Sequence, residues 1–199
     1  MTLKELLNYI RTKSEATENL MRRRMPVIAG QAAKSHFQDN FRKSGFVDNG
    51  LKPWMPAKRL SGSGKGAASN YKTLTSGRNH LFGSIKYIPG DAAVTIRNDV
   101  EYAAIHNEGG RVNTHPTVTP KMKKFAWAKY YEALGGRKPA KNATVPEDAA
   151  RWRALALTKK TKLNIKYIMP KRQFIGESEE LNDKISEKLD KELEKIWNL

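Results

Sequence analysis

The amino-acid sequence predicts an α+β fold, in which long N-terminal helices and a C-terminal helix accompany a small, mainly antiparallel sheet. Apolar residues recur at helical spacing near both ends of the chain. Two short alternating stretches, residues 84–88 and 93–97, flank a Pro-Gly-Asp turn, which is typical of a hairpin. Residues 163–168 alternate weakly and predict a third strand. We expect the C-terminal helix to pack on this sheet.

The N-terminal region predicts two helical stretches. Thr2 followed by Glu5 fits a capping box, in which each side chain bonds the other residue's backbone N–H. A second stretch runs from about residue 15 to 43 and contains Pro26, which removes a backbone hydrogen bond and predicts a kink or a fresh helix start. Gly45 is a stop signal for this helix.

Residues 46–80 have the composition of irregular structure, with prolines on both sides of Trp54. We expect its basic, Gly/Ser-rich part, at about residues 57–72, to form a flexible loop. Gly64-Lys65 resembles a phosphate-binding loop only superficially, because Gly66 stands where that motif needs a hydroxyl residue. No nucleotide or other cofactor is therefore predicted.

The rest of the chain predicts short helices and a long final one. Glycine pairs at 109–110 and 135–136 end two of the helices. The expected elements are a helix at 101–108, a helix opened by Thr119-Pro120, a helix at 148–157 with a capping box of Thr144 and Glu147, and a final helix capped by Ser178. An extended insertion is expected at about residues 136–160. The 199 residues suit one sizeable core, or at most two small ones, and we expect a single domain over 1–199.

Charge is distributed unevenly along the chain. The formal net charge is +17, and residues 51–172 alone hold 24 basic and 7 acidic side chains, whereas residues 173–199 hold 4 and 8. The positive electrostatic field of residues 51–172 attracts nucleic acid or acidic protein surfaces. The absence of cysteine excludes disulfides and thiolate chemistry. The chain has no apolar run of about 18 residues, so no contact with a membrane is expected.

Two patterns in the sequence indicate functions other than a purely structural one. His106 and Glu108 near Arg111 offer a base, an acid and a phosphate clamp, as a metal-dependent nuclease needs. The simpler interpretation, which we favour, is a packed helix that ends at two glycines. The histidines lack the spacing of a metal site, and no metal site is predicted. Lysines at 121–124, interleaved with aromatic residues, indicate sequence-nonspecific nucleic-acid binding as the other alternative.

Five segments of the chain stand out when they are taken together and in order. They are residues 36–46 (HFQDNFRKSGF), Trp54 between its prolines, residues 74–85 (LTSGRNHLFGSI), residues 102–110 (YAAIHNEGG), and residues 170–176 (PKRQFIG) before Ser178. Together they resemble the phage virion morphogenesis family, which includes the tail-completion proteins of Mu-like phages. The resemblance spans about residue 20 to the C-terminus. Gln173 departs from the family pattern, which has proline after the arginine of the fifth segment, and residues 136–160 are longer than is typical.

The resemblance implies a non-enzymatic structural protein that acts in tail completion or head–tail joining. It implies a place at the head–tail junction or tail end of the virion after synthesis in the host cytoplasm. Expected partners are other neck and tail proteins (connector, tail terminator or tail tube) and further copies of the chain in a closed ring, such as a hexamer. Nonspecific DNA contact is compatible with this role. The candidate interaction residues are Trp54, Lys65, His106, Arg111 and Arg172.

Overall fold

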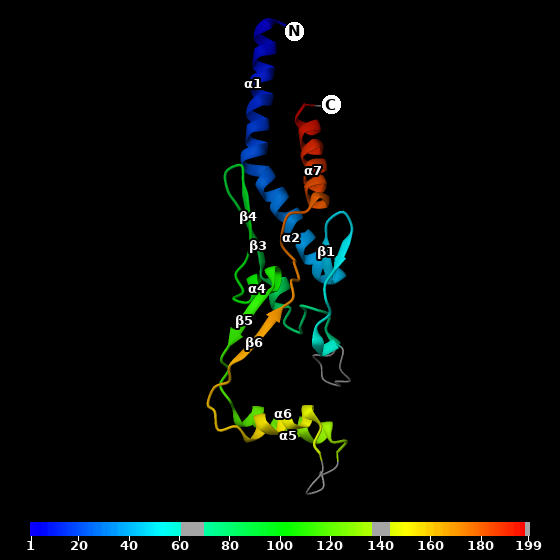
Figure 1. Cartoon of the computed structure of the whole chain (residues 1–199). Helices are drawn as coiled ribbons and strands as arrows, with labels where there is room; N and C mark the ends of the chain where they lie inside the picture. The colour runs from blue at the N-terminus through cyan, green and yellow to red at the C-terminus, as the bar shows by residue number, and fades with distance from the viewer. Residues whose placement is uncertain (61–69, 137–143, 198–199) are drawn as a thin grey trace. The chain divides into compact units, whose positions relative to one another are not determined.

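A computed structural model describes residues 1–60, 70–136 and 144–197 of the chain (Figure 1). Lys65 and most of the Gly/Ser-rich segment lie outside the described residues. Two compact units can be distinguished, one formed by residues 1–110 with 169–199 and the other by residues 111–168. The expectation of one domain over 1–199 stays a prediction. No helix in the described part of the chain is both long and apolar enough to cross a membrane.

The first unit begins with a nearly continuous helical segment. Helix α1 (Leu3–Asn19) starts with the predicted capping box, in which the Thr2 N–H donates to Glu5 Oε2 over 2.7 Å. A π-helical turn, η1 (Leu20–Arg24), then joins α1 to helix α2 (Met25–Lys43). Pro26 lies in the first turn of α2, and the Arg22 carbonyl, four residues before it, accepts a hydrogen bond from the Ala92 N–H over 3.1 Å. The backbone stays helical from α1 through η1 into α2, so the proline follows a π-helical turn rather than a separately capped helix start.

Helix α2 ends at Lys43, two residues before the expected glycine, and Ser44 rather than Gly45 caps it. Ser44 adopts the left-handed conformation (φ 56°, ψ 38°), and its N–H caps the helix on the carbonyls of Asn40 and Phe41. Strands β1 (Gly45–Val47) and β2 (Leu51–Pro53) follow as an antiparallel pair. Asn49 and Gly50 both have positive φ in the connection, as tight hairpins require. The prediction of irregular structure for residues 46–80 is therefore wrong at residues 46–53, where Asn49 and Gly50 turn the chain between two strands.

The second hairpin is the predicted one. Strands β3 (Ile85–Pro89) and β4 (Val94–Asn98) pair antiparallel, with Ile85 opposite Asn98. A short 3-10 turn, η2 (Lys58–Leu60), and helix α3 (His80–Gly83) precede it. Gly30 allows α2 to approach this hairpin closely, since a Cβ there would lie 2.5 Å from Cδ2 of Tyr87. Helix α2 thereby separates the two hairpins into small sheets of their own, where the sequence predicted one sheet.

Helix α7 (Glu179–Trp197) ends the described chain and packs along α2 and α1 (Figure 1). Ser178 caps it as predicted, accepting a hydrogen bond from the Leu181 N–H at 3.2 Å. The Ser178 hydroxyl also donates to the Val47 carbonyl over 3.0 Å, which ties the start of the helix to strand β1. The α+β class is confirmed, and α7 packs mainly on helices α2 and α1, where the sequence predicted packing on a sheet.

The core of the first unit gathers aromatic residues from four segments of the chain. The Phe41 ring lies 5.4 Å from the Trp54 ring and 5.1 Å from the Phe174 ring, measured between centroids. Phe41 and Phe174 are each 1% exposed. The buried members of this core are Ala33, Phe37, Phe41, Phe46, Trp54, Leu81, Ile85, Ala103, Phe174 and Leu181.

The second unit consists of two packed helices and a two-stranded ribbon. Helices α5 (Pro120–Ala133) and α6 (Glu147–Leu157) bury Ala126 and Ala149 completely. Strands β5 (Gly110–Thr114) and β6 (Ile165–Met169) form the ribbon, of which the sequence predicted only the second strand. Thr119 caps α5 as predicted. The capping box predicted for α6 was wrong, since Pro146 precedes that helix and no side chain caps it. The insertion expected at 136–160 includes α6, and residues 137–143 lie outside the described chain.

Candidate functional site

Residues 170–176 form an extended segment that two asparagine side chains hold in place. Asn107 Oδ1 accepts hydrogen bonds from the backbone N–H groups of Phe174 (2.8 Å) and Ile175 (3.0 Å), and its Nδ2 donates to the Ile175 carbonyl (3.0 Å). Asn40 donates to the Phe174 carbonyl (3.1 Å) and accepts from the Val47 N–H (3.0 Å). We call these contacts the asparagine clamp. Side chains thus provide the hydrogen bonds that a neighbouring strand would otherwise supply.

Three of the sequence-predicted interaction residues meet at this clamp. Trp54 Nε1 donates to the Gln173 carbonyl over 2.7 Å, and Arg172 Nε donates to the Met55 carbonyl over 2.8 Å. The Arg172 N–H bonds the carbonyl of His106 over 2.9 Å. The side chains of Trp54 and Arg172 are both 7% exposed. Their polar groups bond the protein backbone, so in this structure they tie segments of the first unit together.

The other predicted residues are not at the clamp. Arg111 is exposed in β5, at the start of the second unit, and Lys65 lies outside the described residues. Glu108, the acid of the nuclease alternative, is exposed and accepts a hydrogen bond from Asn107 Nδ2 over 2.5 Å. No group of three or more potential metal ligands occurs in the part of the chain that the structure describes.

The two clamp asparagines were not identified from the sequence. Each lies within a segment that carries the family resemblance, residues 36–46 and 102–110. A polar residue that replaces an apolar one in a helical stripe is the signal that could have found Asn40, which is completely buried. Asn107 gave no such signal, because its partners lie 67 and 68 residues further along the chain.

Replacing Gly109 with alanine is expected to destabilise the first unit by about 2–4 kcal/mol. Gly109 has φ 70° and ψ −170°, a backbone conformation that is essentially restricted to glycine. An added Cβ would lie 2.7 Å from the Lys171 backbone nitrogen and 2.9 Å from the Met169 carbonyl oxygen. Urea denaturation measures the loss. Gly83→Ala, at an open position in α3, is the control and should change stability by less than about 1 kcal/mol.

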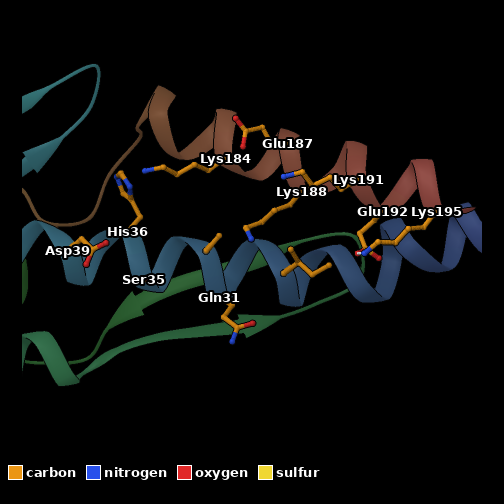
Figure 2. A pocket seen from close by; sticks show the side chains of 12 residues that line it. Gln31, Ser35, His36, Asp39, Lys184, Glu187, Lys188, Lys191, Glu192 and Lys195 are labelled. Atoms are coloured by element: carbon orange, nitrogen blue, oxygen red, sulfur yellow. Dashed lines mark hydrogen bonds and ion pairs between the residues drawn. The ribbon is translucent and has the colours of Figure 1, made fainter. Parts of the chain in front are cut away.

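A groove of about 810 Å³ runs between α2 and α7 (Figure 2). One face of α7 lines it with lysines that recur every three or four residues, at positions 184, 188, 191 and 195. Glu192 balances part of this charge through ion pairs with Arg24 and Lys195, both 2.6 Å long. Lys188 and Lys191 form no ion pair with another described residue. The groove is therefore hydrophilic and suits a polar partner.

His36 lies at one end of this groove, where Lys184 points toward it (Figure 2). The imidazole is 5% exposed, and its Nε2 lies 3.1 Å from the Val47 carbonyl oxygen. Burial lowers the pKa of His36 below its usual value, and the charge of Lys184 acts in the same direction. Burial and the charge of Arg172 likewise lower the pKa of His106. Both residues therefore favour the neutral form in the folded protein.

The free energy of unfolding is expected to fall as the pH is lowered from about 7.5 to about 5. Because the folded-state pKa of His36 lies below the unfolded value of about 6.5, its contribution is complete above that value. The contribution is lost as pH falls through the folded-state pKa, since the imidazolium is tolerated better in the unfolded chain. His36→Gln should reduce the slope, which urea denaturation at several pH values measures. An unchanged slope in that variant would contradict this assignment.

The second unit carries most of the positive charge of the protein. Residues 111–168 contain 14 basic and 3 acidic side chains, a balance of +11 out of the total of +17. Only two ion pairs occur among the described residues of this unit, Lys129 with Glu132 and Arg151 with Glu147. Most of its basic side chains are exposed. The unit thus presents a strong and largely unpaired positive field to its surroundings.

Comparison with known proteins gives one match. Residues 2–194 match the model of the phage virion morphogenesis family. Neither a curated protein nor a solved structure matches the chain. The match extends over nearly the whole chain, including all five segments from which the resemblance was inferred. The chain therefore belongs to the phage virion morphogenesis family and acts in the assembly of a phage virion.

Proposed function

We propose that the protein completes the phage tail or joins the head to the tail, as a structural component without enzymatic activity. The strongest support comes from the contacts that residues of the family-resembling segments make. Trp54, Asn107 and Arg172 direct their polar groups to backbone atoms of the first unit. Such residues build a rigid scaffold, and a scaffold that presents charged surfaces serves assembly.

A closed ring of identical subunits is the expected form of the assembled protein. A ring requires two different, complementary surfaces on each subunit, related by a rotation that closes. Helix α7 presents a row of exposed acidic residues that form no ion pair with any described residue. The second unit presents an excess of exposed basic residues. These opposite charges support contact between neighbouring copies. The acidic row consists of Asp183, Glu187, Asp190 and Glu194.

An amber mutation in the gene, followed by electron microscopy of the lysate, tests this proposal. Loss of a joining or completion protein should leave DNA-filled heads and tails of normal length that remain separate. The same mutation in a suppressor host is the control and should restore joined particles. Intact, infectious particles from the non-suppressor host would contradict the proposal. Heads without DNA would also contradict it, because they would indicate an earlier block.

A second candidate role, nonspecific contact with DNA, is supported by the balance of +11 within residues 111–168. Exposed lysines and arginines attract phosphate groups and release the counterions bound to them. Aromatic rings accompany the charges, with Phe125 against Trp152 at 5.8 Å and Trp127 stacked on Tyr131 at 6.0 Å between centroids. A protein at the head–tail junction would meet the DNA that passes through it.

We expect the purified protein to bind duplex DNA with a strong dependence on salt. Changing Lys159, Lys160 and Lys162 together to glutamine should lower the magnitude of the log–log salt slope by about 2 to 3, since each phosphate contact contributes about 0.9. Fluorescence anisotropy at several salt concentrations measures the slope. The control changes Lys184, Lys188 and Lys191 of α7 to glutamine, which removes the same charge. Equal effects of the two triple variants would exclude a specific role of the second unit.

A further inference from the structure

A cavity of about 220 Å³ lies beside the asparagine clamp, entirely within the first unit. Arg172 and His106 line it from the clamp side. Side chains at positions 57, 59, 73–76, 80 and 81, together with Tyr102, complete the described wall. The polar groups among these are Arg59, Thr73, Thr75, Ser76, His80 and Tyr102.

The described residues that line this cavity are positively charged overall and include neither aspartate nor glutamate. The sequence explains why, because residues 49–90 contain seven basic side chains and no acidic one. Arg59 is held in place by hydrogen bonds to the carbonyls of Tyr71 (3.1 Å) and Lys72 (2.7 Å). The cavity therefore combines fixed cationic groups with neutral hydrogen-bond donors.

Arg172 is the buried charge in this lining. Its guanidinium is 7% exposed and bonds only neutral acceptors among the described residues, namely the carbonyls of Met55 and Pro56 and the sulfur of Met169. A buried charge without an opposite charge nearby carries a large desolvation cost. Burial lowers the pKa of Arg172, and the neighbouring charge of Arg59 adds to this effect. An anion in the cavity would relieve both unfavourable contributions.

His106 provides an independent indication of a missing partner. Its Nδ1 atom is buried and has no hydrogen-bond partner among the described residues. Buried nitrogen atoms of histidine are normally hydrogen-bonded, and those that are not call for an explanation. In the tautomer that carries a proton on Nδ1, this atom is a donor. His106 lines the cavity, so a small movement of its ring would bring this atom to an oxygen acceptor there, which no described protein group supplies.

We propose that this cavity binds the carboxylate of an acidic side chain supplied by a partner protein. Arg172 would provide the charge, and the hydroxyl groups of Thr73 and Ser76, together with His106, would donate hydrogen bonds. A protruding aspartate or glutamate can enter a cavity of this size, whereas phosphates on a DNA duplex lie on a broad surface and meet exposed cations. That the partner is another virion component rests on the proposed function, but carboxylate binding itself does not.

The pKa of His106, followed by NMR of the histidine ring in the purified full-length protein, tests this proposal. Sodium acetate and N-acetylaspartate should each raise that pKa by about one unit or more relative to sodium chloride of equal ionic strength, since a nearby negative charge stabilises the imidazolium. His36 is an internal control, because it lies outside this cavity and should not respond. Both probes leaving His106 unchanged would overturn the proposal. A response to inorganic phosphate or duplex DNA, but to neither carboxylate, would also overturn it.

A second test places a carboxylate in the cavity wall by substitution and leaves Arg172 unchanged. Ser76 is exposed and lines the cavity, so Ser76→Asp should raise the His106 pKa without ligand and weaken the response to acetate at least tenfold. Ser186→Asp adds the same charge on α7, away from the cavity, and should have neither effect. Equal behaviour of the two variants would refute the site. Because these measurements need no phage, their failure would leave the amber test of the proposed function unaffected.

Discussion

Phe174→Ala is expected to destabilise the protein by about 3–5 kcal/mol. The side chain is 1% exposed, and its ring contacts Phe41 at the centre of the core. Removing it leaves a cavity at the point where the asparagine clamp attaches the extended segment to α2. Neighbouring rings cannot fill that space easily, because Phe41 is also held against Trp54.

Urea denaturation, followed by circular dichroism, measures this loss. Leu51→Ala is the matched control, since Leu51 is also apolar but 49% exposed, and its loss should cost less than about 1 kcal/mol. A similar cost for the two variants would show that Phe174 does not belong to a tightly packed core.

Asn40→Asp is expected to have the second large effect, about 3–5 kcal/mol at pH 7. Asn40 is completely buried and both donates to the Phe174 carbonyl and accepts from the Val47 N–H. An ionised carboxylate keeps the acceptor but cannot donate, and it faces a carbonyl oxygen without a counter-charge. The change is nearly isosteric, so the loss reports hydrogen bonding and charge rather than volume.

The pH dependence of this variant provides an additional test. Burial raises the folded-state pKa of an aspartate above its unfolded value of about 3.9, so the protonated form is favoured in the folded protein. A protonated carboxyl group can donate to the Phe174 carbonyl. The difference from the wild type should therefore grow as the pH rises from about 4.5 to 7.5. Asn182→Asp, at an exposed position of α7, should show little change, and a constant difference for Asn40→Asp would contradict the clamp.

The sequence predicted those elements whose signals are local. The capping box at Thr2 and Glu5 and the cap at Ser178 involve residues three apart, and both are found in the structure. The hairpin around Pro89 needs only its two alternating strands and the turn between them. Such features depend on neighbouring residues, so the pattern along the chain is sufficient to predict them.

The clamp could not be predicted because it depends on contacts between distant residues. Asn40 and the carbonyl of Phe174 are 134 positions apart in the chain. No periodicity reports a side chain that bonds the backbone of a remote extended segment. For the same reason, the sequence indicated that Trp54 and Arg172 were important but not that they are buried. Their contact with a partner stays a prediction.

The structure shows which part of the protein holds the excess positive charge, which composition alone does not reveal. The sequence established a net charge of +17, and the structure assigns most of the excess to a separate compact unit, residues 111–168. Binding of DNA or of a neighbouring subunit can thus be altered in one unit while the core and the clamp of the other unit stay intact. The triple lysine variants described above use this separation.

The most direct test of the central claim, that the protein is a structural part of the particle, is reconstitution in a lysate that lacks it. Purified protein added to separate heads and tails should restore plaque-forming particles in proportion to the amount added, until a fixed number of copies per particle is reached. The protein should then remain in the purified virions. Full restoration by far fewer copies than particles, or infectious virions that lack the protein, would indicate turnover and contradict this account.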